Sequence, residues 1–163
     1  MPTTLTLPSD RTTFALGHWL GQHLSVGTVL LLEGDLGSGK TTLTKGLGAG
    51  LGITEAIDSP TFTLINEYRE GRLPLYHVDL YRLTTTDTSS LFLESYWEGI
   101  EYAPGIMAIE WAERLQFLPP EPLKIGLTYR QPTGRQVSLI PSTALQTSLL
   151  EALTSDAILA HEV

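Results

Sequence analysis

The chain has 163 residues, of which 42% are apolar and 17% charged, a balance that predicts one compact domain spanning residues 1–163 and argues against extensive disorder. It contains no cysteine, so disulfides and thiolate metal sites are not expected. Its start lacks a basic segment leading into an apolar core, and no apolar run approaches the ~20 residues that span a bilayer, so we expect a cytoplasmic location and no membrane role. The formal net charge of -8 repels polyanions on average, which disfavours direct nucleic-acid binding but allows a small phosphate ligand at one locally positive site.

The first two predicted elements are a strand over residues 3–7 and a helix over residues 11–24. Ser9 and Asp10 are good N-cap candidates for this helix, and leucine recurs every fourth residue between positions 16 and 24. The N-terminal segment is therefore predicted to be folded.

A strand, a glycine-rich turn and a helix are predicted next. Residues 29–32 form a continuous apolar run, the pattern of a strand buried on both faces, and leucines spaced by four after residue 42 predict a helix. Between these elements, residues 34–41 read Gly-Asp-Leu-Gly-Ser-Gly-Lys-Thr and fit the P-loop pattern G-x-x-x-x-G-K-[ST]. A strand before and a helix after are the context that this motif needs.

The residues of this loop predict binding of ATP with Mg²⁺. Glycines let backbone N–H groups curl around phosphate oxygens at the positive end of a helix. Lys40 is expected to neutralise the β and γ phosphates, the Thr41 hydroxyl to coordinate magnesium, and Thr42 to reach the α phosphate. The predicted nucleotide-binding residues of the loop are Gly37, Ser38, Gly39, Lys40, Thr41 and Thr42.

A P-loop hydrolase also needs an acid at the end of a neighbouring strand, and two positions qualify. Residues 62–68 and 73–80 read as the strands of a hairpin, with Asp79 near the end of the second. Residues 106–109 read as a short buried strand, and Glu110 follows it. Either acid, standing alone, could be an ordinary solvated carboxylate, whereas beside a P-loop a role at the metal or its water is the preferred interpretation.

Two other features lie near these acids. Residues 59–62 read Ser-Pro-Thr-Phe, and the proline holds Ser59 extended, so the segment is either an ordinary turn or a switch whose hydroxyls face the γ phosphate. His77, between a tyrosine and a valine, is interpreted as a packed, hydrogen-bonded residue and is assigned no role.

The remaining chain completes a mixed sheet. Residues 84–99 are predicted to be a loop leading into a short helix, residues 123–129 and 135–140 a last pair of strands, and the leucine-rich tail a helix. The sum is an α/β fold in which roughly seven strands form a mixed central sheet flanked by about four helices, as in a single P-loop NTPase domain.

Four segments together resemble the TsaE family, the bacterial ATPase of tRNA threonylcarbamoyladenosine biosynthesis. They read GDLGSGKTT at 34–42, SPTFTLINEY at 59–68, HVDLYRL at 77–83 and IEWAE at 109–113. The resemblance covers roughly residues 5–140 in unbroken order. It departs at Ala112, where the family usually has proline, and over residues 89–105, which leaves the partner contacts open.

The resemblance implies slow ATP hydrolysis in support of TsaB and TsaD homologues, which install threonylcarbamoyl on adenosine 37 of tRNAs reading ANN codons. The tRNA would be contacted only through that complex. By position, Asp79 would lie by the γ phosphate, and Glu110 would join Thr41 at the metal or its water. The resemblance also places the adenine between Asp10 and Gly134.

Three hypotheses follow: a TsaE-type ATPase, a small-molecule kinase using the same loop, and a nucleotide-gated binding module without significant hydrolysis. The seven arginines are scattered, unlike the arginine-rich lids of nucleoside kinases. GTP is disfavoured because the only asparagine, Asn66, is followed by glutamate and so lies outside an N-K-x-D motif.

Overall fold

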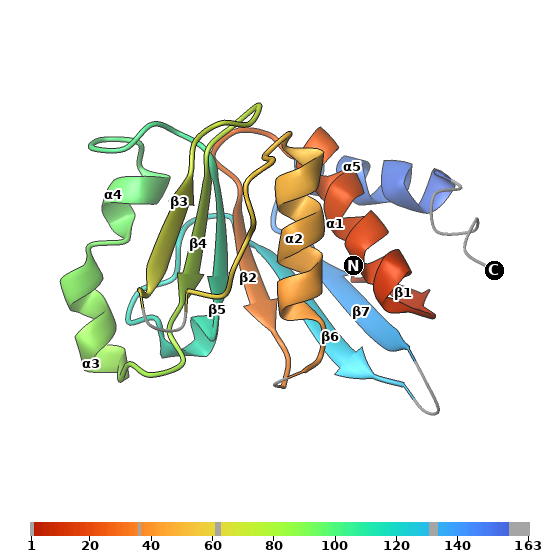
Figure 1. The fold of residues 1–163 in the computed structure, drawn as a ribbon, viewed down its shortest axis with the longest axis horizontal. Coiled ribbons are helices and arrows are strands. Elements are labelled where there is room, and N and C mark those ends of the chain that lie inside the picture. Colours follow the sequence, from red (N-terminus) through yellow and green to blue (C-terminus); the bar gives the residue numbers. More distant parts are fainter. Residues whose placement is uncertain (1, 36, 61–62, 131–133, 157–163) are drawn as a thin grey trace.

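The computed structural model describes residues 2–35, 37–60, 63–130 and 134–156. In this part of the chain the strands form one seven-stranded sheet in the order β1-β7-β6-β2-β5-β4-β3 (Figure 1). The strands are β1 (Thr3–Leu7), β2 (Val29–Glu33), β3 (Ile65–Tyr68), β4 (Leu75–Asp79), β5 (Ile106–Glu110), β6 (Leu123–Tyr129) and β7 (Arg135–Ile140).

The centre of the sheet is parallel and its two ends are antiparallel. Strand β2 pairs in parallel with β5 and β6, and β4 pairs in parallel with β5. The β3–β4, β6–β7 and β1–β7 pairs are antiparallel. The mixed α/β sheet predicted from the sequence is confirmed, and the carboxyl ends of β2, β4 and β5 meet at one edge, where open α/β sheets place their ligands.

The helices cover both faces of this sheet (Figure 1). They are α1 (Asp10–His23), α2 (Lys40–Gly50), α3 (Thr85–Thr88), α4 (Glu94–Trp97) and α5 (Ala144–Ser155). Alternate residues of β2 enter different cores: Leu30 and Leu32 pack with the leucines of α1, α2 and α5, while Val29 and Leu31 pack with the side of α4. This division explains why β2 reads as an unbroken apolar run.

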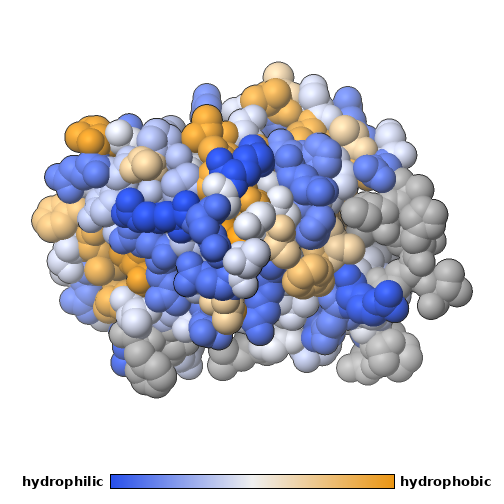
Figure 2. All heavy atoms as spheres, turned by 45° about the horizontal axis from the view of Figure 1, so that its top comes forward, coloured by the Kyte–Doolittle hydropathy of each residue, from blue (hydrophilic) through white to orange (hydrophobic). Residues whose placement is uncertain are grey.

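On the face drawn in Figure 2, hydrophilic and hydrophobic residues are mixed in small areas. Over the described ranges, the helices are all too short or too polar to cross a bilayer.

Helices α1 and α2 approach so closely that glycine is required at their contact. A Cβ atom on Gly17 would lie 2.1 Å from the carbonyl oxygen of Leu43, and one on Gly46 would lie 2.1 Å from that of Phe14. Side chains never reach such distances from backbone, so these glycines set the separation of the two helices. Helix α1 therefore fixes the position of α2, whose first residue follows the glycine-rich loop.

Some element boundaries differ from the sequence prediction for local reasons. Helix α1 begins at Asp10 because the Ser9 side chain accepts the Thr12 backbone N–H at 3.4 Å and acts as N-cap. The predicted loop after residue 83 contains α3, where Thr84 and Asp87 form a capping box. A 3₁₀ turn then separates α3 from α4.

The hairpin strands are shorter than predicted. Strand β3 begins at Ile65 because Leu64 has φ 71, a left-handed conformation that a strand does not continue through. Residue 62, the first of the predicted strand, lies outside the described residues, as does residue 61 of the Ser-Pro-Thr-Phe segment. Strand β4 starts after Pro74, which has no N–H for the ladder, and ends at Asp79.

Candidate functional site

The described part of the glycine-rich loop has the backbone of an anion-binding turn. Gly37 has φ 78, and Gly39, the N-cap of α2, has φ 111, both conformations that favour glycine. No side chain caps this described helix end, so its first backbone N–H groups lack the capping acceptor that a side chain would supply. Leu36 lies outside the described residues. An anion placed here would meet backbone donors and the positive end of α2.

Lys40, the first residue of α2, is buried at 5% exposure. Its Nζ donates to the Gly34 carbonyl at 2.7 Å and lies 4.3 Å from the centre of the Trp111 ring. Trp111, which has φ 60, follows directly after β5. An ammonium held by one carbonyl and an aromatic face can be redirected toward a phosphate.

The two predicted acids lie side by side at the ends of neighbouring strands. Asp79 and Glu110 end β4 and β5 and are paired in register, with exposures of 6% and 4%. Asp79 Oδ1 accepts the backbone N–H of Tyr81 at 2.9 Å. Glu110 Oε2 lies 2.6 Å from Nε2 of His77, a fully buried residue whose Nδ1 has no hydrogen-bond partner among the described residues. His77 is thus packed and hydrogen-bonded, as interpreted from the sequence, and its partner is a predicted site residue.

These groups surround one cavity of about 370 Å³ at the carboxyl edge of the parallel strands. Of the sequence-predicted site residues, its lining includes Asp10, Gly37, Gly39, Lys40, Thr41, Thr42, Asp79 and Glu110. Ser38 lies buried behind the loop with its Oγ unpartnered among the described residues, and Gly134 accepts a hydrogen bond from Arg135 Nη1 at 3.0 Å. The fold thus brings together residues that lie more than a hundred positions apart in the chain.

Sequence reasoning did not single out Arg135, Tyr81 or Trp111 as members of the site, although all three line the cavity. Tyr81 and Trp111 lie side by side with ring centres 5.0 Å apart. The sequence pointed to Tyr81 and Trp111 only through their positions just after the two predicted acids. Arg135 had a similar signal, since it follows the predicted Gly134, but nothing in the chain order connects it with the glycine-rich loop.

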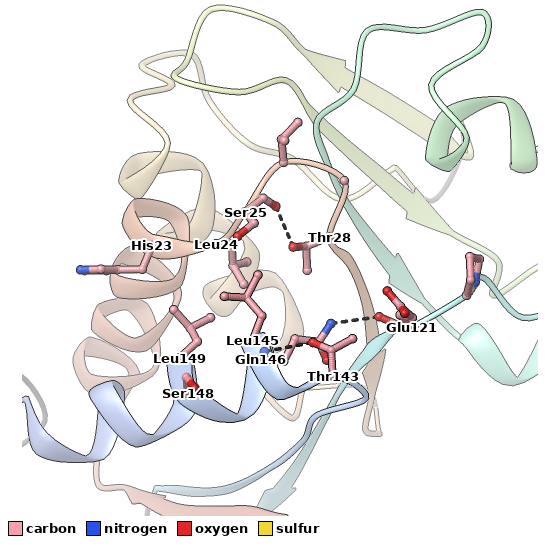
Figure 3. Close-up of a pocket in the computed structure, with 13 residues that line it drawn as sticks. His23, Leu24, Ser25, Thr28, Glu121, Thr143, Leu145, Gln146, Ser148 and Leu149 are labelled. Atoms are coloured by element: carbon pink, nitrogen blue, oxygen red, sulfur yellow. Dashed lines mark hydrogen bonds between the residues drawn. The ribbon is translucent and has the colours of Figure 1, made fainter.

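A second cavity, of about 440 Å³, lies at the opposite edge, before β2 and β6 begin (Figure 3). Its wall is formed by the end of α1, the residues before β2, and α5. Gln146 Nε2 donates to the Glu121 carbonyl at 2.9 Å, and Thr28 Oγ1 donates to the Ser25 carbonyl at 2.7 Å, so these polar groups are already paired. The charged side chains predicted to form the site, Lys40, Asp79 and Glu110, line the first cavity.

A mixed sheet with a glycine-rich loop between its central parallel strand and the following helix, and acids at the ends of the adjacent strands, defines a P-loop NTPase-like protein. The family profile described as "Threonylcarbamoyl adenosine biosynthesis protein TsaE" matches residues 7–137. The chain therefore belongs to the TsaE family.

Individual relatives agree with this assignment. A tRNA threonylcarbamoyladenosine biosynthesis protein TsaE of Nostoc sp. is 57% identical over 139 residues, covering 85% of this chain and 86% of that protein. The protein of the same name from Bacillus subtilis is 51% identical over 69% of this chain and 68% of its own length. The crystal structure of B. subtilis YdiB superposes with a TM-score of 0.78 at 34% identity, covering 95% of both chains.

Proposed function

We propose that this chain is a cytoplasmic ATPase that hydrolyses ATP with Mg²⁺ and supports homologues of TsaB and TsaD in forming threonylcarbamoyladenosine at position 37 of tRNAs reading ANN codons. Membership of the TsaE family supports the place in tRNA threonylcarbamoyladenosine biosynthesis. The tRNA would be reached only through the complex.

One observation carries the ATPase proposal: Lys40, Thr41, Asp79 and Glu110 line one cavity at the carboxyl ends of parallel strands. A cation, a hydroxyl and two carboxylates in this arrangement match the needs of phosphoryl transfer, where catalysis is mostly positioning and charge stabilisation. The uncapped start of α2 adds backbone donors for the phosphates.

The residues present fit a magnesium site of the kind that relies on phosphates. Magnesium is usually held by one or two carboxylates, waters and substrate phosphates rather than by an all-protein cage. The described residues contain no group of three or more histidine, aspartate or glutamate side chains able to hold a metal by themselves. Thr41 and Glu110 would hold the ion, which when bound supplies charge neutralisation for the phosphate oxygens.

The other residues have distinct roles in this proposal. Lys40 would leave the Gly34 carbonyl to bind the β and γ phosphates, and Thr42 would reach the α phosphate. Asp79, which accepts the backbone N–H of Tyr81, would sense the γ phosphate and pass its presence on to that residue. Asp10 and Gly134 would flank the adenine.

Phosphate release from ATP, measured without any added acceptor, tests this proposal. Wild-type protein should release phosphate slowly, whereas Lys40→Ala should lose at least about 100-fold of that rate because the cation on the phosphates is removed. Lys45→Ala is the matched control, since Lys45 lies on the same helix and is exposed. Release only with an acceptor would indicate a kinase, and no turnover at all would indicate a nucleotide-gated binding module.

The partners require a separate experiment. Tagged protein should copurify TsaB and TsaD homologues, and the amount recovered should depend on the nucleotide supplied. Failure to recover either homologue under ATP or ADP would contradict the partner assignment and leave the ATPase assignment to stand on the turnover measurement.

A further inference from the structure

Arg135, the first residue of β7, reaches back across the molecule to the glycine-rich loop. Its Nη2 donates to the Gly37 carbonyl at 3.0 Å and its Nε donates to the Ser38 carbonyl at 2.7 Å. Its Nη1 donates to the Gly134 carbonyl of its own hairpin at 3.0 Å. One guanidinium therefore joins two consecutive loop carbonyls to the start of β7.

The position of this guanidinium is fixed by its other neighbours. It lies 3.9 Å from the centre of the Tyr129 ring, on the strand paired with β7, and its side chain is only 14% exposed. Asp10 Oδ1 is 3.9 Å from Nη2, but this carboxylate is 75% exposed, so it contributes little to holding the arginine. The stacking on tyrosine and the three carbonyl bonds are what orient the side chain.

These contacts matter because of the geometry that an anion-binding loop requires. For backbone N–H groups to point inward at a phosphate, the carbonyls of the same peptides must point outward. A flexible glycine-rich loop has many other conformations available, and each would lower the fraction of molecules ready to bind. Of the two peptides whose carbonyls Arg135 holds, Gly37–Ser38 already donates its N–H to the Asp35 carbonyl at 3.0 Å, a turn within the loop, while Ser38–Gly39 has its N–H on the side opposite the held carbonyl. A donor that holds both carbonyls therefore selects this one loop conformation before any ligand arrives.

We propose that Arg135 is a positioning residue that holds the glycine-rich loop in its anion-binding conformation. This inference rests on the proposed nucleotide function of the same site. Arg135 acts through the loop backbone, so its contribution is to the phosphates of any ligand and does not depend on the base. Lysine cannot replace it, because a single ammonium on a flexible stem does not match the planar fork that spans the carbonyls of Gly37, Ser38 and Gly134.

The test compares two ligands and two substitutions by calorimetric titration. The ligands are ADP and inorganic tripolyphosphate, each with Mg²⁺, and the variants are Arg135→Lys, which keeps the charge, and Arg135→Met, which removes it. Arg130→Met serves as the matched control, because Arg130 belongs to the same hairpin but is exposed and bonds through Nη1 to Thr6 Oγ1 at 3.2 Å. Circular dichroism verifies that each variant is folded.

We expect each Arg135 variant to bind ADP and tripolyphosphate more weakly, with both dissociation constants raised by the same factor of roughly ten or more. Arg130→Met should leave both dissociation constants unchanged. Hydrogen exchange of ligand-free protein should also show faster exchange in the peptide covering residues 37–43 of Arg135→Lys. This second measurement needs no ligand, so it reports the loop itself.

Three outcomes would overturn the inference. If the variants lost affinity for ADP but kept wild-type affinity for tripolyphosphate, Arg135 would be a contact for the base or ribose. Wild-type affinity in Arg135→Lys would mean that its charge alone matters. Unchanged exchange of the loop peptide would show that the loop keeps its shape without the arginine. If the wild-type protein bound neither ligand, the proposed function itself would fail, which is a different result from wild-type binding with indifferent variants.

Discussion

Glu110 combines two properties that are unusual in one side chain. It is a carboxylate at only 4% exposure, and one of its oxygens is held at 2.6 Å by a histidine that is itself fully buried. Buried carboxylates are retained where they have partners, since an unpaired charge away from water is costly. His77 therefore orients Glu110 and leaves its second oxygen for the cavity that Glu110 lines.

Replacing Glu110 by glutamine should separate binding from hydrolysis. The amide oxygen of glutamine can still accept a hydrogen bond from His77, so the fold and the binding of nucleotide on the loop and Lys40 should persist. The negative charge at the proposed metal site would be lost, and phosphate release should fall roughly 100-fold or more. Turnover, its magnesium dependence and ADP affinity should be measured together.

Glu113→Gln provides the comparison for this change, because Glu113 is a nearby exposed acid just beyond β5. It should behave as wild type. Full hydrolysis by Glu110→Gln with unchanged magnesium dependence would remove Glu110 from the metal site.

Single residues differed in how well the sequence identified them. The sequence could predict Lys40, Asp79 and Glu110, because each belongs to a short motif of a few consecutive residues. Arg135 could not, because its partner Ser38 is 97 residues away and the contact exists only after β7 joins the sheet. The roles of the predicted residues in binding and catalysis stay predictions.

At the scale of elements, the contact between α1 and α2 connects packing to the site. Gly17 and Gly46 allow the backbones to touch, and α2 starts at Lys40. Any change that pushes the helices apart would also move the start of α2 relative to Asp79 and Glu110. Stability and ligand affinity are therefore expected to change together at this contact.

Gly17→Ala tests that coupling. The new methyl group would meet the Leu43 carbonyl at 2.1 Å, a clash that requires the helices to separate, and the free energy of unfolding should fall by about 2 kcal/mol. ADP affinity should fall as well. Urea unfolding and calorimetric titration measure the two effects.

Gly126→Ala is the appropriate comparison, since a Cβ atom there would have no neighbour within 4 Å. It should change neither quantity measurably. Equal stability of Gly17→Ala and Gly126→Ala would show that the helices separate without cost and would refute the close-packing argument.

The elements themselves were largely predictable, whereas their boundaries were not. The apolar runs of β2 and β5 indicated buried strands because each is covered on both faces. The start of β3 could not be predicted, because it depends on the left-handed conformation of Leu64, and leucine does not favour that conformation. Helix α3 was missed although Thr84 and Asp87 form a capping box, because four residues are too few to show helical periodicity.

At the scale of the whole molecule, the net charge of -8 bears on the tRNA substrate of the pathway. Binding to a nucleic acid is driven by lysine and arginine contacts that release phosphate counterions, and this chain has ten such residues against eighteen acids. Two of the ten, Lys40 and Arg135, are committed to the glycine-rich loop.

The isolated protein should therefore bind tRNA only weakly, with a dissociation constant above about 10 µM at physiological salt. Filter binding or fluorescence anisotropy with unmodified tRNA measures this affinity, and the same assay with the partner proteins present provides the positive reference. Submicromolar binding by the protein alone would contradict the expectation that tRNA is reached through the complex.

The two faces of the sheet are covered by helices of very different length. Helices α1 and α2 have 14 and 11 residues and lock together through glycine, while α3 and α4 have four residues each. Helices that short do not persist without tertiary contacts, so their order depends on packing such as the stacked rings of Tyr96 and Tyr102. The glycine-rich loop therefore belongs to the layer with the long helices, and the layer of α3 and α4 is expected to open locally at a lower free energy.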